Sequence, residues 1–236
     1  MKPKRKGGVA IRIGIDGPAG AGKSSIAKAL AQTLGFVHID TGAMYRALTW
    51  LALERDIPLD NEEALTSLAQ EADIRLQVSP TGEAQDVYCQ GRRITEEIRG
   101  LAVSDAVSTV SAVAGVRQIM LDIQRNLAAN QDVVMDGRDI GTVVLPDAEC
   151  KIFLTASIEE RALRRKKERE GTDQDRSLEE IMAEISQRDE ADQNRASSPL
   201  RPAEDSVIVD TSALSFAESL DTIISIVQSL RTASGA

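Results

Sequence analysis

The strongest restriction on the fold comes from a glycine-rich segment near the start of the chain, with the sequence Gly17-Pro18-Ala19-Gly20-Ala21-Gly22-Lys23-Ser24. Glycines at this spacing let the backbone wrap around a small group with its N–H groups pointing inward. A β-branched run over residues 9–15 precedes the segment and a helical pattern follows from Gly22, so a helix N-terminus should add a positive end. The segment fits the Walker A pattern in full and predicts a binding site for nucleotide phosphates.

Within this loop, Lys23 is expected to reach the β- and γ-phosphates, and the Ser24 hydroxyl is expected to join the shell of a Mg²⁺ ion. Asp136 follows the apolar run Val133-Val134-Met135 and has Walker B character, so it is the second predicted metal ligand, binding directly or through water. The alternative interpretation of Asp136 is a turn aspartate at a strand end. The residues assigned to ATP binding are the loop, its lysine and the two serines that follow: Gly17, Pro18, Ala19, Gly20, Ala21, Gly22, Lys23, Ser24 and Ser25.

Strand and helix patterns alternate along the rest of the chain, which favours a parallel sheet with right-handed crossovers. Five strands are predicted, near residues 9–15, 36–40, 132–136, 151–155 and 207–210. Helices are predicted over residues 22–35, 43–55, 61–71, 100–130, 157–170, 177–195 and 215–231. The fold class is therefore α/β, a P-loop core with a five-stranded parallel sheet flanked by helices.

Two segments are expected to stand apart from this core. Residues 74–94 alternate between apolar and polar side chains around the turn sequence Ser79-Pro80-Thr81-Gly82, which predicts a small antiparallel insertion packed beside the sheet. Residues 157–170 carry many charges and few apolar residues, so we expect a helical lid that is too charged to be buried, is mobile without ligand and orders over bound phosphates.

The predicted domain spans residues 9–231, with an insertion at about 60–98 that binds the acceptor and a lid at about 157–175. Residues 1–8 are expected to form a disordered basic tail, and residues 232–236 a second tail.

Composition excludes several function classes. The formal charge of −9 argues against a general nucleic-acid coat, and the lack of 18 consecutive apolar residues argues against a transmembrane helix. Two cysteines, Cys89 and Cys150, exclude a disulfide framework, and one histidine, His38, makes triads and multi-histidine metal sites improbable. We therefore expect a cytoplasmic monomer that binds small molecules rather than nucleic acid or membrane.

The arginine pattern indicates a second anionic substrate. Arg46 ends the segment 40–46, Arg138 lies within the segment 136–139, and Arg188 is spaced with Asp192 and Arg195 along one helical face. Guanidinium groups match phosphate oxygens better than point charges do. A ladder of ion pairs within the helix is the alternative for residues 188–195, and a solvated charged helix is the alternative for the basic residues after Arg165.

Four segments together resemble bacterial cytidylate kinases: Gly17–Ser25, Asp40-Thr41-Gly42-Ala43-Met44-Tyr45-Arg46, Asp136-Gly137-Arg138-Asp139-Ile140-Gly141-Thr142-Val143-Val144, and Arg188-Asp189-Glu190-Ala191-Asp192-Gln193-Asn194-Arg195. The order and spacing of these segments match the family from about residue 9 to 231. The resemblance implies in-line transfer of the γ-phosphate of ATP to CMP or dCMP, with Mg²⁺. It also implies a core, a lid and an enlarged acceptor-binding region.

The resemblance assigns roles residue by residue. The positions implied for acceptor binding are Asp40, Thr41, Arg46, Ser108, Arg117, Arg138, Asp139, Arg188, Asp192 and Arg195, with Ser108, Arg117 and Asp139 at the cytosine edge. The positions implied for catalysis are Lys23, Arg138, Arg161, Arg164, Arg165 and Arg188. Two positions depart from the common family pattern, because Ser24 stands in place of Gly and Thr41 in place of Ser. Both changes keep or add a hydroxyl group.

Two other functions stay open on the sequence. One is a P-loop kinase for a different small acceptor, such as UMP, AMP or shikimate, and the other is a regulatory module that binds ATP without turnover. The carboxylate of Asp139 and the guanidinium of Arg117 favour cytosine, because they suit its N4 amino donor and ring acceptors. A nucleotide phosphate is itself an anionic nucleophile, so positioning and charge neutralisation suffice without a general base.

Overall fold

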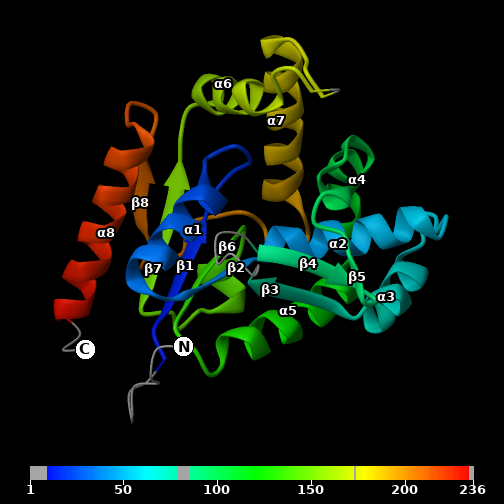
Figure 1. Cartoon of the computed structure of the whole chain (residues 1–236), viewed down its shortest axis with the longest axis horizontal. Helices are drawn as coiled ribbons and strands as arrows, with labels where there is room; N and C mark the ends of the chain where they lie inside the picture. Colours follow the sequence, from blue (N-terminus) through cyan, green and yellow to red (C-terminus); the bar gives the residue numbers. More distant parts are fainter. Residues whose placement is uncertain (1–9, 79–84, 173, 234–236) are drawn as a thin grey trace.

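The computed structural model describes residues 10–78, 85–172 and 174–233 (Figure 1). The tail predicted at residues 1–8, the turn at 79–82 and residues 234–236 lie outside the described residues. The strands are β1 (Arg12–Asp16), β2 (Val37–Asp40), β3 (Ile74–Val78), β4 (Gln85–Cys89), β5 (Arg92–Arg93), β6 (Val133–Gly137), β7 (Cys150–Thr155) and β8 (Val207–Asp210).

The helices alternate with these strands. They are α1 (Lys23–Leu34), α2 (Thr41–Glu54), α3 (Glu62–Glu71), η1 (Glu97–Arg99), α4 (Leu101–Ala112), α5 (Ala114–Ala128), the π-type turn η2 (Ile140–Val144), α6 (Ile158–Arg169), α7 (Leu178–Asn194) and α8 (Phe216–Ala233).

The main sheet has five strands in the order β2-β6-β1-β7-β8, and every neighbouring pair is parallel. This confirms the predicted parallel sheet. Because the strands are parallel, their carboxyl ends meet at one edge, and the register places Asp16 beside Gly137 and Asp40 beside Asp136. The central strand β1 is buried almost throughout, although it begins with Arg12 and ends with Asp16, because helices cover both faces of the sheet. One core cluster joins the sheet to α1 and α8, as Figure 1 shows for those helices.

The insertion is a separate antiparallel sheet in the order β3-β4-β5, packed against α2 and not part of the main sheet. This confirms the prediction for residues 74–94, although the two-residue strand β5 was not anticipated. The side chain of Gln85 joins the two sheets. Its Nε2 donates to the His38 carbonyl at 2.7 Å, and its Oε1 accepts from the Asp40 N–H at 3.2 Å. A second core cluster, from α2 to α5 and β4, fills the insertion.

Residues 100–130 are helical as predicted, but the helical segment is broken in two. The chain forms α4 and α5, which meet at an angle of 94° because Val113 adopts an extended conformation (φ −66°, ψ 119°). The bend brings the start of α5 against α3, where a Cβ on Gly115 would lie 2.3 Å from Thr66 Oγ1. Within the described ranges, no single helix is long and apolar enough to cross a membrane, and α4 and α5 reach that length and apolarity only as this bent pair.

The expectation that residues 157–170 carry too much charge for burial is also wrong in part. Helix α6 packs on α7 through Ala162, Ile181 and Ile185. Two of its arginines, Arg161 and Arg169, are buried because α7 supplies carboxylates for them. Sequence reasoning treated α6 as an isolated charged helix, whereas charge pairing across the helix interface permits burial.

Candidate functional site

The glycine-rich loop between β1 and α1 has a backbone that only glycine adopts readily. Gly17 has φ +150°, and a Cβ there would lie 1.9 Å from the Leu154 carbonyl oxygen of β7. Gly22, at the helix start, has φ +85° and provides no capping side chain. The first turn of α1 contains no acidic residue, so its free N–H groups are available to an anion.

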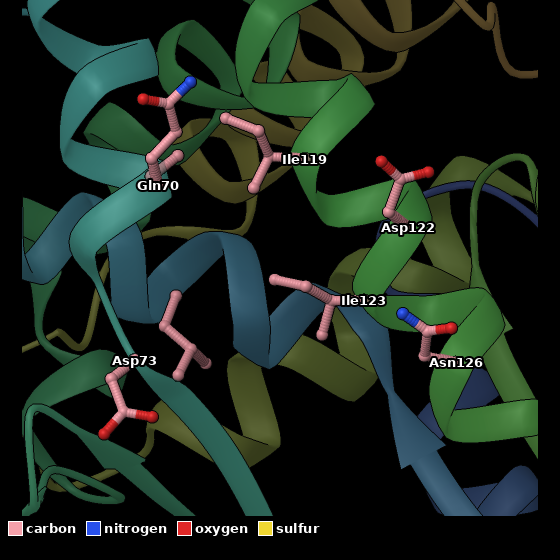
Figure 2. Close-up of a pocket in the computed structure, with 8 residues that line it drawn as sticks. Gln70, Asp73, Ile119, Asp122, Ile123 and Asn126 are labelled. Carbon is pink, nitrogen blue, oxygen red and sulfur yellow. The ribbon is translucent and has the colours of Figure 1, made fainter.

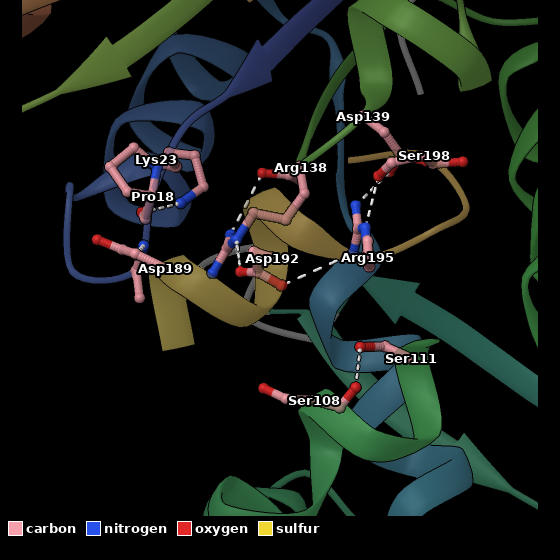
Figure 3. A network of polar contacts seen from close by, with 12 residues as sticks. Pro18, Lys23, Ser108, Ser111, Arg138, Asp139, Asp189, Asp192, Arg195 and Ser198 are labelled. Atoms are coloured by element: carbon pink, nitrogen blue, oxygen red, sulfur yellow. Dashed lines mark hydrogen bonds and ion pairs between the residues drawn. The ribbon is translucent and has the colours of Figure 1, made fainter. Parts of the chain in front are cut away.

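Lys23 lies buried inside the loop, with an exposed fraction of 6%. Its Nζ donates to the Pro18 carbonyl oxygen at 2.7 Å (Figure 3). Burial and the nearby Arg138 lower the pKa of Lys23 well below its usual range, and Asp136 opposes this shift. An anion in the loop would restore the charge balance around this ammonium group.

Ser24 and Asp136, the two predicted metal ligands, lie 112 positions apart in the chain and contact one another in the structure. The Ser24 hydroxyl donates to Asp136 Oδ2 at 2.6 Å. The other carboxylate oxygen, Oδ1, lies 2.7 Å from His38 Nε2, a contact that the sequence did not reveal. Burial, the largest single influence, disfavours the charged imidazole, but the bond to Asp136 together with the charges of Asp136 and Asp40 outweighs it and raises the pKa of His38. A hydroxyl and a carboxylate side by side are oxygen donors of the kind that Mg²⁺ prefers, so these residues fit the expected ion.

Asp40 and Thr41 lie beside this pair, where β2 ends and α2 begins. The Asp40 carboxylate caps α2 by accepting from the Ala43 N–H at 3.0 Å. Burial, with Asp136 nearby, raises the pKa of Asp40. The Thr41 hydroxyl donates to the Asp136 carbonyl oxygen at 2.8 Å. Both residues therefore fix the start of α2, which carries Arg46.

Next to the loop, four arginines from separate elements form an electropositive region. They are Arg46, Arg138, Arg165 and Arg188. Burial, reinforced by the neighbouring arginines, lowers the pKa of Arg46 to about 10 and that of Arg188 to about 9. The Nε of Arg188 is buried with no hydrogen-bond partner in the described part of the chain. Excess positive charge on half-buried side chains, with a buried donor atom that lacks a partner, indicates a site for a bound anion.

Asp192 connects this region to α7. It accepts from Arg138 Nε at 2.8 Å and lies 3.7 Å from Arg195 Nη1 (Figure 3). Burial alone would raise its pKa, but the two arginines and Arg188 lower it. The face formed by residues 188–195 is therefore not a closed ladder of ion pairs, because its strongest contact goes to another segment of the chain.

A buried pair of opposite charge, Arg117 and Asp139, lies at the far side of the arginines. Arg117 Nη2 donates to Asp139 Oδ2, and Arg117 Nη1 donates to the Ser111 carbonyl oxygen at 3.1 Å. The Arg117 guanidinium carbon stacks 5.6 Å from the ring centre of Tyr45. Ser108 takes part through its carbonyl oxygen, which accepts from Ser111 Oγ at 3.2 Å (Figure 3). The pair combines a charge and a flat stacked surface, which suits a planar heterocycle.

The three arginines assigned to the lid, Arg161, Arg164 and Arg165, contact different parts of the molecule. Arg161 Nη1 donates to the Ala19 carbonyl oxygen at 2.8 Å and to Asp189 Oδ2 at 2.5 Å, while Asp189 Oδ1 accepts from the Ala19 N–H at 3.0 Å. Arg164 donates to the Thr211 carbonyl oxygen at 2.8 Å. Arg165 pairs with Glu184 at 3.0 Å. Asp189 was not singled out from the sequence, and only the packing of α7 on the loop reveals its contact.

A separate cavity of about 410 Å³ lies between α3 and α5 (Figure 2). Its lining includes Asp73, Ile119, Asp122 and Asn126 and none of the predicted site residues. The candidate site is therefore the polar edge of the sheet and not this cavity.

Comparison with known proteins follows this geometry. A family model described as "Cytidylate kinase" matches residues 13–229. The chain is 49% identical over 216 residues to a cytidylate kinase of Desulfitobacterium hafniense, covering 92% of each. It is 50% identical over 215 residues to one of Bacillus licheniformis, covering 91% of this chain and 95% of the relative.

Other relatives are longer. A bifunctional pantoate ligase/cytidylate kinase of Synechococcus is 49% identical over 237 residues, and the chain spans 44% of its length. Among solved structures, an uncharacterized protein from Eubacterium ventriosum has a TM-score of 0.52 at 15% identity, covering 93% of this chain and 98% of that one, and so shares the fold.

Proposed function

The chain belongs to the cytidylate kinase family, and we propose that it transfers the γ-phosphate of ATP to CMP or dCMP, giving CDP or dCDP. One observation carries the proposal. A phosphate loop and a separate half-buried arginine region lie at the same edge of the sheet, with the Arg117–Asp139 pair beyond them. Two separate anion-binding regions within one active site suit phosphoryl transfer between two nucleotides better than hydrolysis of a single nucleotide.

On the donor side, the loop amides and Lys23 would hold the ATP phosphates. Ser24 and Asp136 would hold Mg²⁺, which when bound neutralises charge on the phosphate oxygens. The bond between Ser24 and Asp136 supports this role because it already brings the two oxygen ligands together. His38 would keep the Asp136 carboxylate oriented through its second oxygen.

On the acceptor side, Arg46, Arg138 and Arg188 would bind the phosphate of the monophosphate, whose oxygen is the nucleophile. Asp192 and Arg195 would lie near the sugar. The attacking phosphate is anionic, so the residues bind, orient and neutralise rather than remove a proton. The absence of a partner for Arg188 Nε among the described residues supports an anion at this position.

The base would lie against the Arg117–Asp139 pair. Cytosine presents an amino donor at N4, where uracil presents a carbonyl acceptor, so a carboxylate there would favour cytosine. Arg161, Arg164 and Arg165 would belong to a lid that closes over the phosphates, and Arg165 is the one of these three that contributes to the electropositive region.

An ADP-release assay with CMP, dCMP, UMP, AMP and shikimate as separate acceptors tests the proposal. We expect ADP release with CMP and dCMP well above that with the other three. Highest turnover with UMP, AMP or shikimate would identify a kinase for another acceptor. ATP binding without ADP release in the presence of any of the five would indicate a regulatory module.

A further inference from the structure

Asp16 is a buried carboxylate at the junction between the phosphate loop and the segment that carries Arg138 and Asp139. It is the last residue of β1, and its exposed fraction is 4%. Its Oδ1 accepts from the Ile140 N–H at 2.8 Å, and its Oδ2 accepts from the Gly141 N–H at 2.7 Å. In the part of the chain that the structure describes, Asp16 forms no ion pair.

Keeping this carboxylate buried costs free energy. Burial, with a smaller contribution from Asp139, raises the pKa of Asp16 to about 6, although the hydrogen bonds from the two amides and the charge of Lys23 act in the opposite direction. An apolar residue at this position would avoid the cost but could not accept two N–H groups. The cost therefore points to a use for the two hydrogen bonds.

The two N–H groups begin the turn η2, directly after Asp139. The first N–H groups of such a turn have no partner within it, and Asp16 supplies both. The carbonyl oxygen of Asp139 is held from the other side by the N–H groups of Val143 and Val144, at 2.9 and 3.1 Å. The peptide group between Asp139 and Ile140 is thus held through both its carbonyl oxygen and its N–H group. The acceptor for the N–H group is Asp16, which directly precedes the phosphate loop.

Close packing leaves this junction little freedom. A Cβ on Gly141 would lie 3.2 Å from the Lys151 side chain and 3.4 Å from Asp16 Oδ2, so no spare room is left beside the carboxylate. On the other side of Asp16, Gly17 is pressed against the Leu154 carbonyl oxygen of β7. The carboxylate is therefore anchored in the sheet and reaches across to the acceptor segment.

We infer that Asp16 is a positioning residue that sets Arg138 and Asp139 relative to the phosphate loop, and thereby orients the acceptor nucleotide. The inference rests on the proposed function, because it takes Asp139 to face the acceptor base. Loss of the Asp16 carboxylate should make the segment with Arg138 and Asp139 more mobile. The phosphate loop, which has its own contacts to β7, should still bind ATP.

The test compares Asp16→Asn with Asp132→Asn as a matched control. Asp132 Oδ1 accepts from the Ile11 N–H at 2.8 Å at the opposite end of the same strand pair. For Asp16→Asn, we expect KM for CMP to rise about 10-fold, on the scale of one or two lost hydrogen bonds, with KM for ATP within about 2-fold of wild type. The ratio of kcat/KM for CMP to that for UMP should shrink, and Asp132→Asn should leave all of these constants near wild type.

Amide hydrogen exchange of residues 138–144 gives a second readout that needs no substrate. The Ile140 and Gly141 N–H groups should exchange at least about 10-fold faster in Asp16→Asn than in Asp132→Asn. If the wild type does not phosphorylate CMP, the proposed function fails while the exchange data still decide whether Asp16 holds the segment.

Three results would overturn the inference. The first is an amide exchange rate in Asp16→Asn equal to that in Asp132→Asn. The second is an equal rise in KM for ATP and for CMP. The third is kinetic constants for CMP that do not change. If Asp16→Asn does not fold, the second variant is Asp16→Ser, which removes the buried charge and leaves a hydroxyl oxygen that can replace at most one of the two acceptor oxygens, so it should give the same pattern. Wild-type constants and exchange in Asp16→Ser would likewise refute the inference.

Discussion

Replacing Asp139 by Asn tests whether this carboxylate reads the base or only holds Arg117. Asp139 and Arg117 are 6% and 7% exposed, so their pair is largely shielded from water. Asn keeps the shape of Asp but loses the charge, and its amide can turn either an oxygen or an NH₂ group toward the base. The variant therefore removes discrimination at N4 while keeping a partner for Arg117.

The expected magnitude has two parts. Loss of the charged acceptor should reduce the CMP:UMP ratio of kcat/KM by about 10-fold or more, which corresponds to about 1–3 kcal/mol of base discrimination. Weakening the buried pair should also lower the free energy of unfolding. Removing one partner altogether costs about 3–5 kcal/mol, and Asn, which still accepts a hydrogen bond, should cost less than that.

The assay measures kcat/KM for CMP and UMP, together with urea unfolding, on purified protein. A matched control is Asp86→Asn, because Asp86 pairs with Arg93 at 2.8 Å on the insertion sheet and contacts none of the predicted site residues. We expect the control to leave the CMP:UMP ratio unchanged. If both efficiencies fall in parallel in Asp139→Asn, the carboxylate only orients Arg117 and does not select cytosine.

Three further outcomes are expected. Lys23→Ala should lower turnover at least about 100-fold, or about 3 kcal/mol, because a preorganised cation is lost where charge moves, and its circular dichroism should match wild type; near-normal turnover would remove Lys23 from the mechanism. Burial raises the pKa of Asp16 from 3.8 to about 6, so the Asp16 carboxylate binds a proton more tightly in the folded protein than in the unfolded chain. Protonation of Asp16 as the pH falls therefore stabilises the folded state. Between pH 7.5 and pH 4.5, the unfolding free energy of wild type should therefore gain about 2 kcal/mol relative to Asp16→Asn, and a constant difference in urea titrations would contradict this. Asp189→Asn should raise KM for ATP more than KM for CMP and lower the unfolding free energy by less than about 3 kcal/mol, because Asn keeps only one of the two acceptor oxygens that Arg161 and the Ala19 amide share; calorimetric ATP binding equal to wild type would show that the contact is only structural.

Features that depend on neighbouring residues were predictable from the sequence. The phosphate loop is eight consecutive residues whose glycines and helix start act locally, and the buried strands are short β-branched runs between turn signals. The separate insertion was predictable because strand alternation and turn chemistry are also local. The break at Val113 was not, because no proline marks it and Gly115, two residues later, lies inside α5, where the packing against Thr66 depends on tertiary structure.

The arrangement of the site was decided by tertiary structure, because its contacts join residues far apart in the chain. The sequence alone pointed to Ser24 and Asp136 but could not bring His38 to the same carboxylate. It marked the lid arginines as exposed charges, whereas α7 supplies Asp189 and Glu184 to bury or hold them. In the sequence, Asp16 is only the last residue of a predicted strand. Its role depends on the N–H groups of Ile140 and Gly141, which lie 124 and 125 positions away. Local chemistry determines which side chains are available, but only the packed sheet and helices determine which of them share a hydrogen bond.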